Sequence, residues 1–370
     1  MTHREYWINA LDHRCSDRFP SDLWIAAEPR DALLERYGTS DFDQVKRILG
    51  VTDMREISVQ WRNPDWENRH DLKVLASNSP HAGGRYILHD ECTFEDEWGI
   101  VMRVGSTGRH DQWLRGPLSE TEEPDASIVT TPPPEQLAFR PDLADHVRAL
   151  KEAGQFTCIS VTVPFKAAWH LRGLENFLMD YHLHPAFVAD MYDRLVEREI
   201  PRLAKAVEAG VDLIKIVGDV AMQDRMIMGE AMWRRFDRPA LKKLLDACRK
   251  ADPNQYFFVH SDGDLSSILG DLVDDLGFHM VNPLQPECMD LDWVKREYGD
   301  RMVMYGCVSL QRTLPFGTPE LVRREVRGLI DRYGENGGLA VAPSNVVDCD
   351  TPLDNIIAMC ETVRDYSPYA

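Results

Sequence analysis

The sequence lacks the features that identify several common classes of protein. No apolar run approaches the ~20 residues that a membrane-spanning helix needs, and charged residues interrupt the amino-terminal stretch where a signal peptide would be apolar. It has no G-x-G-x-x-G after a predicted strand and no Walker A motif, so binding of dinucleotides or nucleoside triphosphates has no support. We therefore expect a cytoplasmic protein without a membrane partner.

Basic residues are also scarce. The chain has 42 Lys and Arg against 61 Asp and Glu, a formal net charge of -19. A nucleic-acid partner needs a basic surface that meets phosphates and releases counterions, so we expect none. The eight cysteines are dispersed without a C-x-x-C pair. In a cytosolic chain this predicts free thiols, among which metal ligands are to be sought.

Strand-like and helical patterns alternate along most of the 370 residues. The run VDLIKIVGD is nearly unbroken in apolar character, as is typical of a parallel strand covered on both faces. Eight strands are predicted, near 20–27, 57–61, 156–163, 211–218, 256–261, 278–284, 302–308 and 338–344. Eight strands that alternate with helices predict an α/β fold, a (β/α)8 TIM barrel forming one domain over 1–370. An open, doubly wound sheet is the alternative.

An irregular insertion is predicted after the second strand, at about 62–140. This stretch is rich in Gly, Pro, Asn and charge, and Pro132–Pro134 predict a stiff return to the barrel. Within it, ILHDECTFEDEWGIVMRV alternates well enough for a hairpin or a small sheet.

Polar side chains follow the carboxyl ends of the later strands, where a barrel of this kind carries its functional residues. In strand order, from the fourth to the eighth, they are Asp219 and Gln223; His260 and Asp262; Gln285, Glu287 and Cys288; Cys307; and Asn345. Imidazole, thiolate and carboxylate are ligands of zinc, and a catalytic zinc keeps three protein ligands and one open position. We predict a metal site from four of these residues, His260, Asp262, Cys288 and Cys307.

Each metal-site residue also has a plainer interpretation. His260 can be a hydrogen-bonded imidazole in a polar mouth, and a free cysteine is commonly a small buried hydrophobe. We favour Cys288 over Cys307 because the sequence QPEC lies in a predicted loop, whereas Cys307 can still face the barrel wall.

The remaining candidates are catalytic or substrate-binding. Asp219 is a candidate general acid or base, with helix capping as the alternative, and Glu287 is a second catalytic candidate. Three amides, Gln223, Gln285 and Asn345, can supply fixed hydrogen bonds to a ligand, or simply make turns. Trp61 is predicted to line a substrate pocket, with local packing as the alternative.

The stretches FFVHSDGD, VNPLQPEC and GGLAVAPSN resemble the uroporphyrinogen decarboxylase-like superfamily. The resemblance covers the chain except the insertion and implies one of two chemistries. These are cofactor-free decarboxylation of uroporphyrinogen and zinc-dependent methyl transfer with a corrinoid protein. The decarboxylases carry an arginine-rich R-Q-A-G-R motif, where this chain has WIAAEPRDALLERYG. Since Arg30 alone cannot neutralise an octacarboxylate, we favour the methyltransferase branch.

The methyltransferases place a His-x-Cys pair after strand five and a Cys after strand eight. The matching positions here are His260, Asp262 and Asn345, so one ligand is kept and two differ. The chain has no D-x-H-x-x-G cobalamin-binding sequence, so the resemblance implies a corrinoid on a separate partner protein.

The resulting hypothesis is a zinc-dependent methyltransferase of the O-demethylase type, acting on a small methylated compound. The alternatives are a cofactor-free decarboxylase or lyase in which Asp219 handles protons, and a non-catalytic barrel that binds a small ligand. Homodimer formation is left open.

Overall fold

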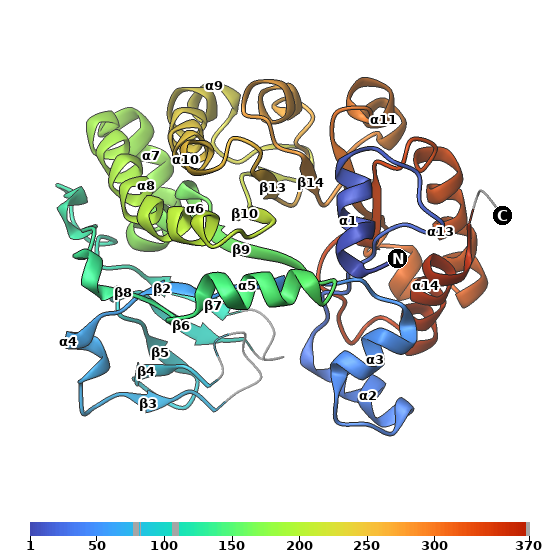
Figure 1. Ribbon diagram of the computed structural model, residues 1–370. Coiled ribbons are helices and arrows are strands. Elements are labelled where there is room, and N and C mark those ends of the chain that lie inside the picture. The colour runs from blue at the N-terminus through green and yellow to red at the C-terminus, as the bar shows by residue number, and fades with distance from the viewer. Residues whose placement is uncertain (77–80, 82, 106–110, 368–370) are drawn as a thin grey trace.

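The computed structural model describes residues 1–76, 81, 83–105 and 111–367. A seven-stranded parallel sheet organises the chain, in the order β1-β9-β10-β13-β14-β15-β16 (Figure 1). Its strands are β1 (Met54–Glu56), β9 (Phe156–Thr162), β10 (Leu213–Val217), β13 (Tyr256–His260), β14 (Met280–Asn282), β15 (Val303–Val308) and β16 (Leu339–Pro343). From β9 onward each strand pairs in parallel with the next strand of this sheet along the chain, which confirms the α/β fold and six of the eight predicted barrel strands.

Helices connect these strands and surround the curled sheet (Figure 1). The α-helices are α1 (His3–Leu11), α2 (Ala27–Tyr37), α3 (Phe42–Leu49), α4 (Pro64–Glu67), α5 (Leu143–Glu152), α6 (Pro164–Arg172), α7 (Leu174–Leu183), α8 (Pro185–Glu208), α9 (Glu230–Met232), α10 (Arg238–Ala251), α11 (Leu291–Tyr298), α12 (Thr313–Phe316), α13 (Pro319–Tyr333) and α14 (Leu353–Asp365). Short 3₁₀ or π turns are η1 (Ala126–Ile128), η2 (Pro134–Gln136), η3 (Trp233–Asp237) and η4 (Asp271–Asp275). In the described part of the chain, no helix combines the length and the apolar character needed to cross a membrane.

The predicted first strand, 20–27, is not a regular strand. Ser21 and Ile25 form only isolated parallel bridges, with Val341 of β16 and with Val347. On the other side, the Ser21 carbonyl accepts a hydrogen bond from the Thr52 N–H, just before β1, at 3.0 Å. The Asp22 carboxylate accepts from the Leu23 N–H at 2.8 Å, and a side chain that binds a nearby backbone donor competes with ladder formation.

The predicted second strand, 57–61, is wrong in position. The parallel strand is β1, where Met54 pairs with Phe156. Residues Val59–Trp61 form β2, which pairs antiparallel with β8 (Leu137–Phe139) in a separate sheet. The alternation of apolar and polar residues in ISVQW correctly predicts a strand, but it does not show which other strand pairs with it. The residues of β1, MRE, are less apolar, and Arg55 forms an ion pair with Asp43 of α3 at 2.8 Å.

A second, antiparallel sheet lies within the stretch predicted as an insertion. Its strands, paired in sequence order, are β3 (Lys73–Val74), β4 (Arg85–Leu88), β5 (Thr93–Glu95), β6 (Val101–Val104) and β7 (Asp111–Arg115). The small sheet predicted within 87–104 is therefore confirmed. Trp113 of β7 anchors it to α6 by donating its indole N–H to the His170 carbonyl at 2.8 Å.

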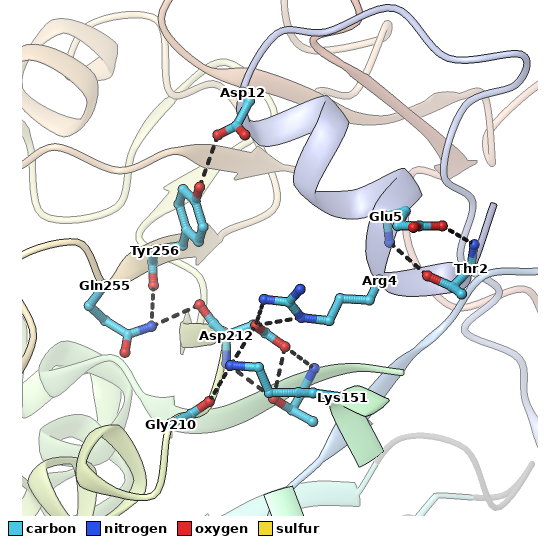
Figure 2. A network of polar contacts seen from close by, with 10 residues as sticks. Thr2, Arg4, Glu5, Asp12, Lys151, Gly210, Asp212, Gln255 and Tyr256 are labelled. Atoms are coloured by element: carbon cyan, nitrogen blue, oxygen red, sulfur yellow. Dashed lines mark hydrogen bonds and ion pairs between the residues drawn. The ribbon is translucent and has the colours of Figure 1, made fainter. Parts of the chain in front are cut away.

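A polar network at the amino ends of β9 and β10 holds α1 against the sheet (Figure 2). The buried Asp212 carboxylate accepts hydrogen bonds from Arg4 at 3.0 Å and from the Thr157 N–H at 3.0 Å. Next to it, the ring of Trp7 lies 5.4 Å from that of Tyr305. Because α1 covers the amino ends of the strands, a ligand-binding site is expected at their carboxyl ends.

Candidate functional site

Polar residues from two neighbouring strands meet at the carboxyl end of the sheet. Val217, the last residue of β10, pairs with His260, the last residue of β13. This register places Asp219 beside His260 and Asp262, and one ligand atom from each of the three lies within 4.8 Å of the others. We refer to Asp219, His260 and Asp262 as the acid–histidine group.

His260 is oriented by an amide behind it. Its Nδ1 lies 2.7 Å from Oδ1 of Asn282, the last residue of β14. An amide oxygen only accepts hydrogen bonds, so Nδ1 donates to it, and in the neutral imidazole Nε2 then keeps its lone pair. This Nε2 lies 4.0 Å from an Asp219 carboxylate oxygen. Asn282 lies within VNPLQPEC, among the polar residues at the end of the predicted sixth strand, but the sequence prediction gave it no role of its own.

The two carboxylates are fixed by different partners. The backbone N–H of Asp262 donates to Asp219 at 3.0 Å, and the Asn345 amide donates to Oδ2 of Asp262. Oδ1 of Asp262 is buried and has no hydrogen-bond partner among the described residues. Burial raises the pKa of Asp262, while the neighbouring His260 acts in the opposite direction. An unsatisfied buried carboxylate oxygen is costly unless a cation or a proton joins it.

The donor set of the acid–histidine group suits a borderline divalent metal. One imidazole nitrogen and two carboxylate oxygens are ligands that Zn²⁺ accepts, and three protein ligands are the number in a catalytic zinc site. Asn282 forms a hydrogen bond with His260 and Asn345 forms one with Asp262, as residues outside the ligand set commonly do in metal sites. The buried Oδ1 of Asp262, which has no hydrogen-bond partner among the described residues, is one atom that could bind such an ion.

The two candidate cysteines lie outside the acid–histidine group. Cys288 is half-buried, and its thiol lies 3.6 Å from the Gln285 side-chain oxygen, which also accepts from the Gly263 N–H at 2.7 Å. Burial raises the pKa of Cys288 to about 11, whereas a metal binds the thiolate.

Cys307 is separated from the mouth altogether. It lies within β15, is completely buried and belongs to the hydrophobic core. Burial raises its pKa well above the ordinary value. Cys307 is therefore not part of the acid–histidine group, because β15 runs to Val308 and this side chain is buried within it.

Two other predicted residues are held by neighbours of their own. Glu287 is nearly buried and accepts a hydrogen bond from the Ser309 hydroxyl, with Arg312 at 3.4 Å. Gln223 lies at the rim, where its amide donates to Gln311 at 2.7 Å. Neither residue is in the acid–histidine group as the described structure defines it.

A cavity of about 750 Å³ lies between the parallel sheet, helices α6 and α8, and the insertion. Trp61, predicted to line a pocket, is in its wall and donates its indole N–H to the Arg198 carbonyl at 2.9 Å. Trp98 joins it, with the Arg198 guanidinium 4.5 Å from the ring centroid. Trp24 links the cavity to the acid–histidine group, since its ring lies 5.2 Å from that of His260.

The sequence prediction missed three cavity residues, Trp24, Lys166 and Lys215. Lys215 carried a clear signal, because it is the only charged residue of the strand LIKIV. Lys166 follows the end of β9 by four residues, so its position after a strand end was a signal as well. Trp24 comes from the irregular first segment, so its direction could not be derived from strand alternation.

Comparisons with known proteins identify the family of the chain and a solved structure with a similar fold. A family model described as uroporphyrinogen decarboxylase (URO-D) matches residues 116–366. A uroporphyrinogen decarboxylase from Methylococcus capsulatus is 24% identical over 294 residues, covering 76% of this chain and 79% of the relative. One from Chlorobaculum parvum is 27% identical over 140 residues, which span only 35% of its length. Among solved structures, a methyltransferase from Methanosarcina mazei superimposes with a TM-score of 0.67 at 18% identity, covering 100% of both chains.

Proposed function

The chain belongs to the uroporphyrinogen decarboxylase family, and within that family we propose that it is a zinc-dependent methyltransferase of the O-demethylase type. It takes a methyl group from a small methylated compound and passes it to a corrinoid carried by a separate protein. The observation that carries this proposal is the acid–histidine group, with its buried and unpartnered Asp262 oxygen. The fold shared with the Methanosarcina methyltransferase is consistent with it.

Asp219, His260 and Asp262 would hold the zinc. When bound, the ion supplies Lewis acidity toward the oxygen that carries the methyl group. Asn282 keeps the proton on Nδ1 of His260, and Asn345 fixes Asp262. The Asp219 side chain is 43% exposed and is therefore open to solvent. We assign Gln285 to the support of the loop at Gly263. Gln223 and Glu287 stay candidates for contacts with the substrate at the carboxyl ends of the strands.

We also propose that the sheet is a complete (β/α)8 barrel over 1–370, with 62–140 inserted. The segment at Pro20–Ile25 takes the eighth position, since it bonds to Val341 of β16 and to Thr52, two residues before β1. This arrangement is the usual one for a site at the carboxyl ends of strands. The acidic composition and the free cysteines support action in the cytoplasm.

The arginine-rich motif of the uroporphyrinogen decarboxylases has no counterpart in this chain. Arg30, the arginine in the stretch that replaces the arginine-rich motif, lies on the surface of α2 and pairs with Asp31 at 2.8 Å. A substrate with eight carboxylates needs several unpaired arginines or lysines in one place.

Methyl transfer and metal content test this proposal together. Purified protein, prepared without chelator, should carry zinc and methylate free cob(I)alamin from at least one member of a panel of methoxylated and methylated compounds. His260→Ala should lose both zinc and transfer, whereas His182→Ala, on the exposed face of α7, should lose neither. Folded wild-type protein that carries no zinc and binds none would contradict the proposal.

Decarboxylation is the second candidate, favoured by the curated relatives, which are uroporphyrinogen decarboxylases. In that case CO2 release would need no metal and would be lost in Asp219→Asn. The same purified protein, treated with chelator, distinguishes the two reactions.

A further inference from the structure

Ser261 lies between His260 and Asp262 in the sequence, directly after β13, and its side chain is completely buried. Its hydroxyl oxygen accepts a hydrogen bond from the Val220 N–H at 3.0 Å. The same hydroxyl donates its proton to the Asp262 carbonyl, also at 3.0 Å. Because Val220 directly follows Asp219 in the sequence, this hydroxyl links the two backbone segments that carry the carboxylates of the acid–histidine group.

This contact extends the pairing of β10 and β13 beyond the ends of the two strands. The Gly218 N–H still donates to the His260 carbonyl at 3.0 Å, as in a parallel ladder. At the next step outward, the side chain of Ser261 takes the part of the backbone acceptor. Further out, the Asp264 N–H donates to the Met222 carbonyl at 2.8 Å. Ser261 therefore lies midway in a series of hydrogen bonds that join the loops after β10 and β13.

The two loops approach each other so closely that a side chain is excluded at Gly263. A Cβ added there would lie 2.3 Å from the Met222 carbonyl oxygen, and the φ of +94° also favours glycine. On its other side, the Gly263 N–H donates to the Gln285 side-chain oxygen at 2.7 Å. The loop that carries Asp262 is therefore held from two sides, which fixes its distance from the loop that carries Asp219.

The Ser261 contact differs from the direct link between the two acidic residues. In that link the Asp262 N–H donates to an Asp219 carboxylate oxygen at 3.0 Å, so it uses an oxygen that a cation would also need. The Ser261 hydroxyl bonds only to backbone groups and leaves the carboxylate oxygens out of the contact. It can therefore stay in place when a cation binds, and without a cation it opposes the mutual repulsion of the two carboxylates.

We propose that Ser261 is a positioning residue, whose hydroxyl fixes the separation of Asp219 and Asp262 so that both carboxylates and His260 reach one metal ion. In taking that ion to be the zinc of the methyltransferase, we rely on the proposed function. Residues outside the ligand set that hold ligands in place commonly change metal affinity about 10- to 100-fold when they are replaced. A residue that serves stability alone would leave the affinity of the folded protein unchanged.

Zinc affinity distinguishes a positioning role from a purely structural one. Folded, full-length Ser261→Ala should bind zinc about 10- to 100-fold more weakly than wild type in competition with a chromophoric chelator. With Co²⁺ in place of zinc, the visible absorption of the bound ion should differ between the two proteins, because that absorption depends on the arrangement of the ligands.

Thr52→Val is the matched control for the loss of a buried hydroxyl. Thr52 is completely buried at the amino end of the sheet, where its hydroxyl accepts from the Ser21 N–H at 2.8 Å and donates to the Ser21 carbonyl at 3.0 Å. Both substitutions leave a buried backbone N–H without its acceptor, so both variants should unfold at a lower urea concentration than wild type. Only Ser261→Ala should also change zinc affinity and the Co²⁺ absorption.

Hydrogen exchange tests the contact between the loops in metal-free protein. The Val220 N–H is buried and bonded to Ser261, so it should exchange slowly in wild type and about tenfold faster or more in Ser261→Ala. Mass spectrometry of a peptide that covers 218–224 measures this rate. If Ser261→Ala does not fold, the wild-type rate still decides, because a Val220 amide that exchanges like an unprotected one would overturn the inference and a slow one would support it.

The outcomes separate this inference from the proposed function. Wild type that binds zinc, together with unchanged affinity in folded Ser261→Ala, would overturn the role of Ser261 and leave the proposed function standing. Weaker zinc binding in Ser261→Ala, with Thr52→Val unchanged, supports that role. If folded wild type binds no zinc, the proposed function fails, and the exchange rate of Val220 alone decides whether Ser261 holds the two loops together.

Discussion

Replacement of Asp237 by Asn should stabilise the protein, and the gain should grow with pH. Asp237 is completely buried beneath α7 and α8, where its Oδ2 accepts from the Tyr192 hydroxyl at 2.9 Å and from the Tyr181 hydroxyl at 3.3 Å. Its Oδ1 has no hydrogen-bond partner in the described structure. Burial without a counter-ion raises the pKa of Asp237 to about 7, although the two tyrosines lower it.

The sign follows from proton linkage. The folded state holds the Asp237 proton up to about pH 7, whereas the unfolded chain releases it near the ordinary value of 3.8. The unfolded state is therefore favoured increasingly as the pH rises between these two values, and the loss levels off above the folded pKa. One pKa unit corresponds to about 1.4 kcal/mol, so the free energy of unfolding loses about 2–3 kcal/mol through this group between about pH 5 and 8.

Urea unfolding of wild type and Asp237→Asn at several pH values measures this loss. The difference between the two proteins isolates Asp237 from the other titrating groups, and it should grow by about 2–3 kcal/mol over that pH range. Asp246→Asn, on the exposed side of α10, is the control and should show no such trend. A difference between wild type and Asp237→Asn that is flat with pH would refute the linkage reasoning.

The remaining predictions concern the network below the sheet, the site and the thiols. Asp212→Ala should lower the free energy of unfolding by about 2–4 kcal/mol, because it leaves the buried Thr157 N–H and Arg4 without their acceptor. A loss below about 1 kcal/mol in urea unfolding would contradict this role of Asp212. Asn282→Ala should weaken zinc about 10- to 100-fold in a chelator competition, because the imidazole of His260 loses its orienting acceptor. Unchanged affinity would count against that role. A thiol reagent should label the exposed Cys15, Cys92 and Cys349 first and the buried cysteines only on unfolding. Fast labelling of Cys307, seen by peptide mass analysis, would contradict its place in the core.

The carboxyl-terminal half of the fold could be predicted because its strands are continuous apolar runs between helices. β10, β13 and β15 lie where the pattern placed them. The amino-terminal strands were harder to predict. β1 is short and carries Arg55 and Glu56, while the stronger alternation belongs to β2, whose partner β8 lies about 78 residues further along the chain. Pairing across such a distance leaves no local signal.

The candidate site was predictable to the extent that strand ends define it. Asp219, His260 and Asp262 directly follow strands, and the parallel register brings them together. Cys307 lies inside both the predicted strand 302–308 and the observed β15, and its burial matches the alternative that it faces the barrel wall. Trp24 required the three-dimensional structure, since it reaches the cavity from an irregular segment.

Zinc titration of chelator-treated protein tests the central claim most directly. A competing chromophoric chelator should report one tight site per wild-type chain. Asp262→Ala should lose this site because it removes the oxygen that has no partner in the described part of the fold, whereas Cys288→Ala and Cys307→Ala should retain it. The account would be contradicted by a folded wild-type chain without a tight site, or by a site that survives Asp262→Ala and disappears in Cys288→Ala.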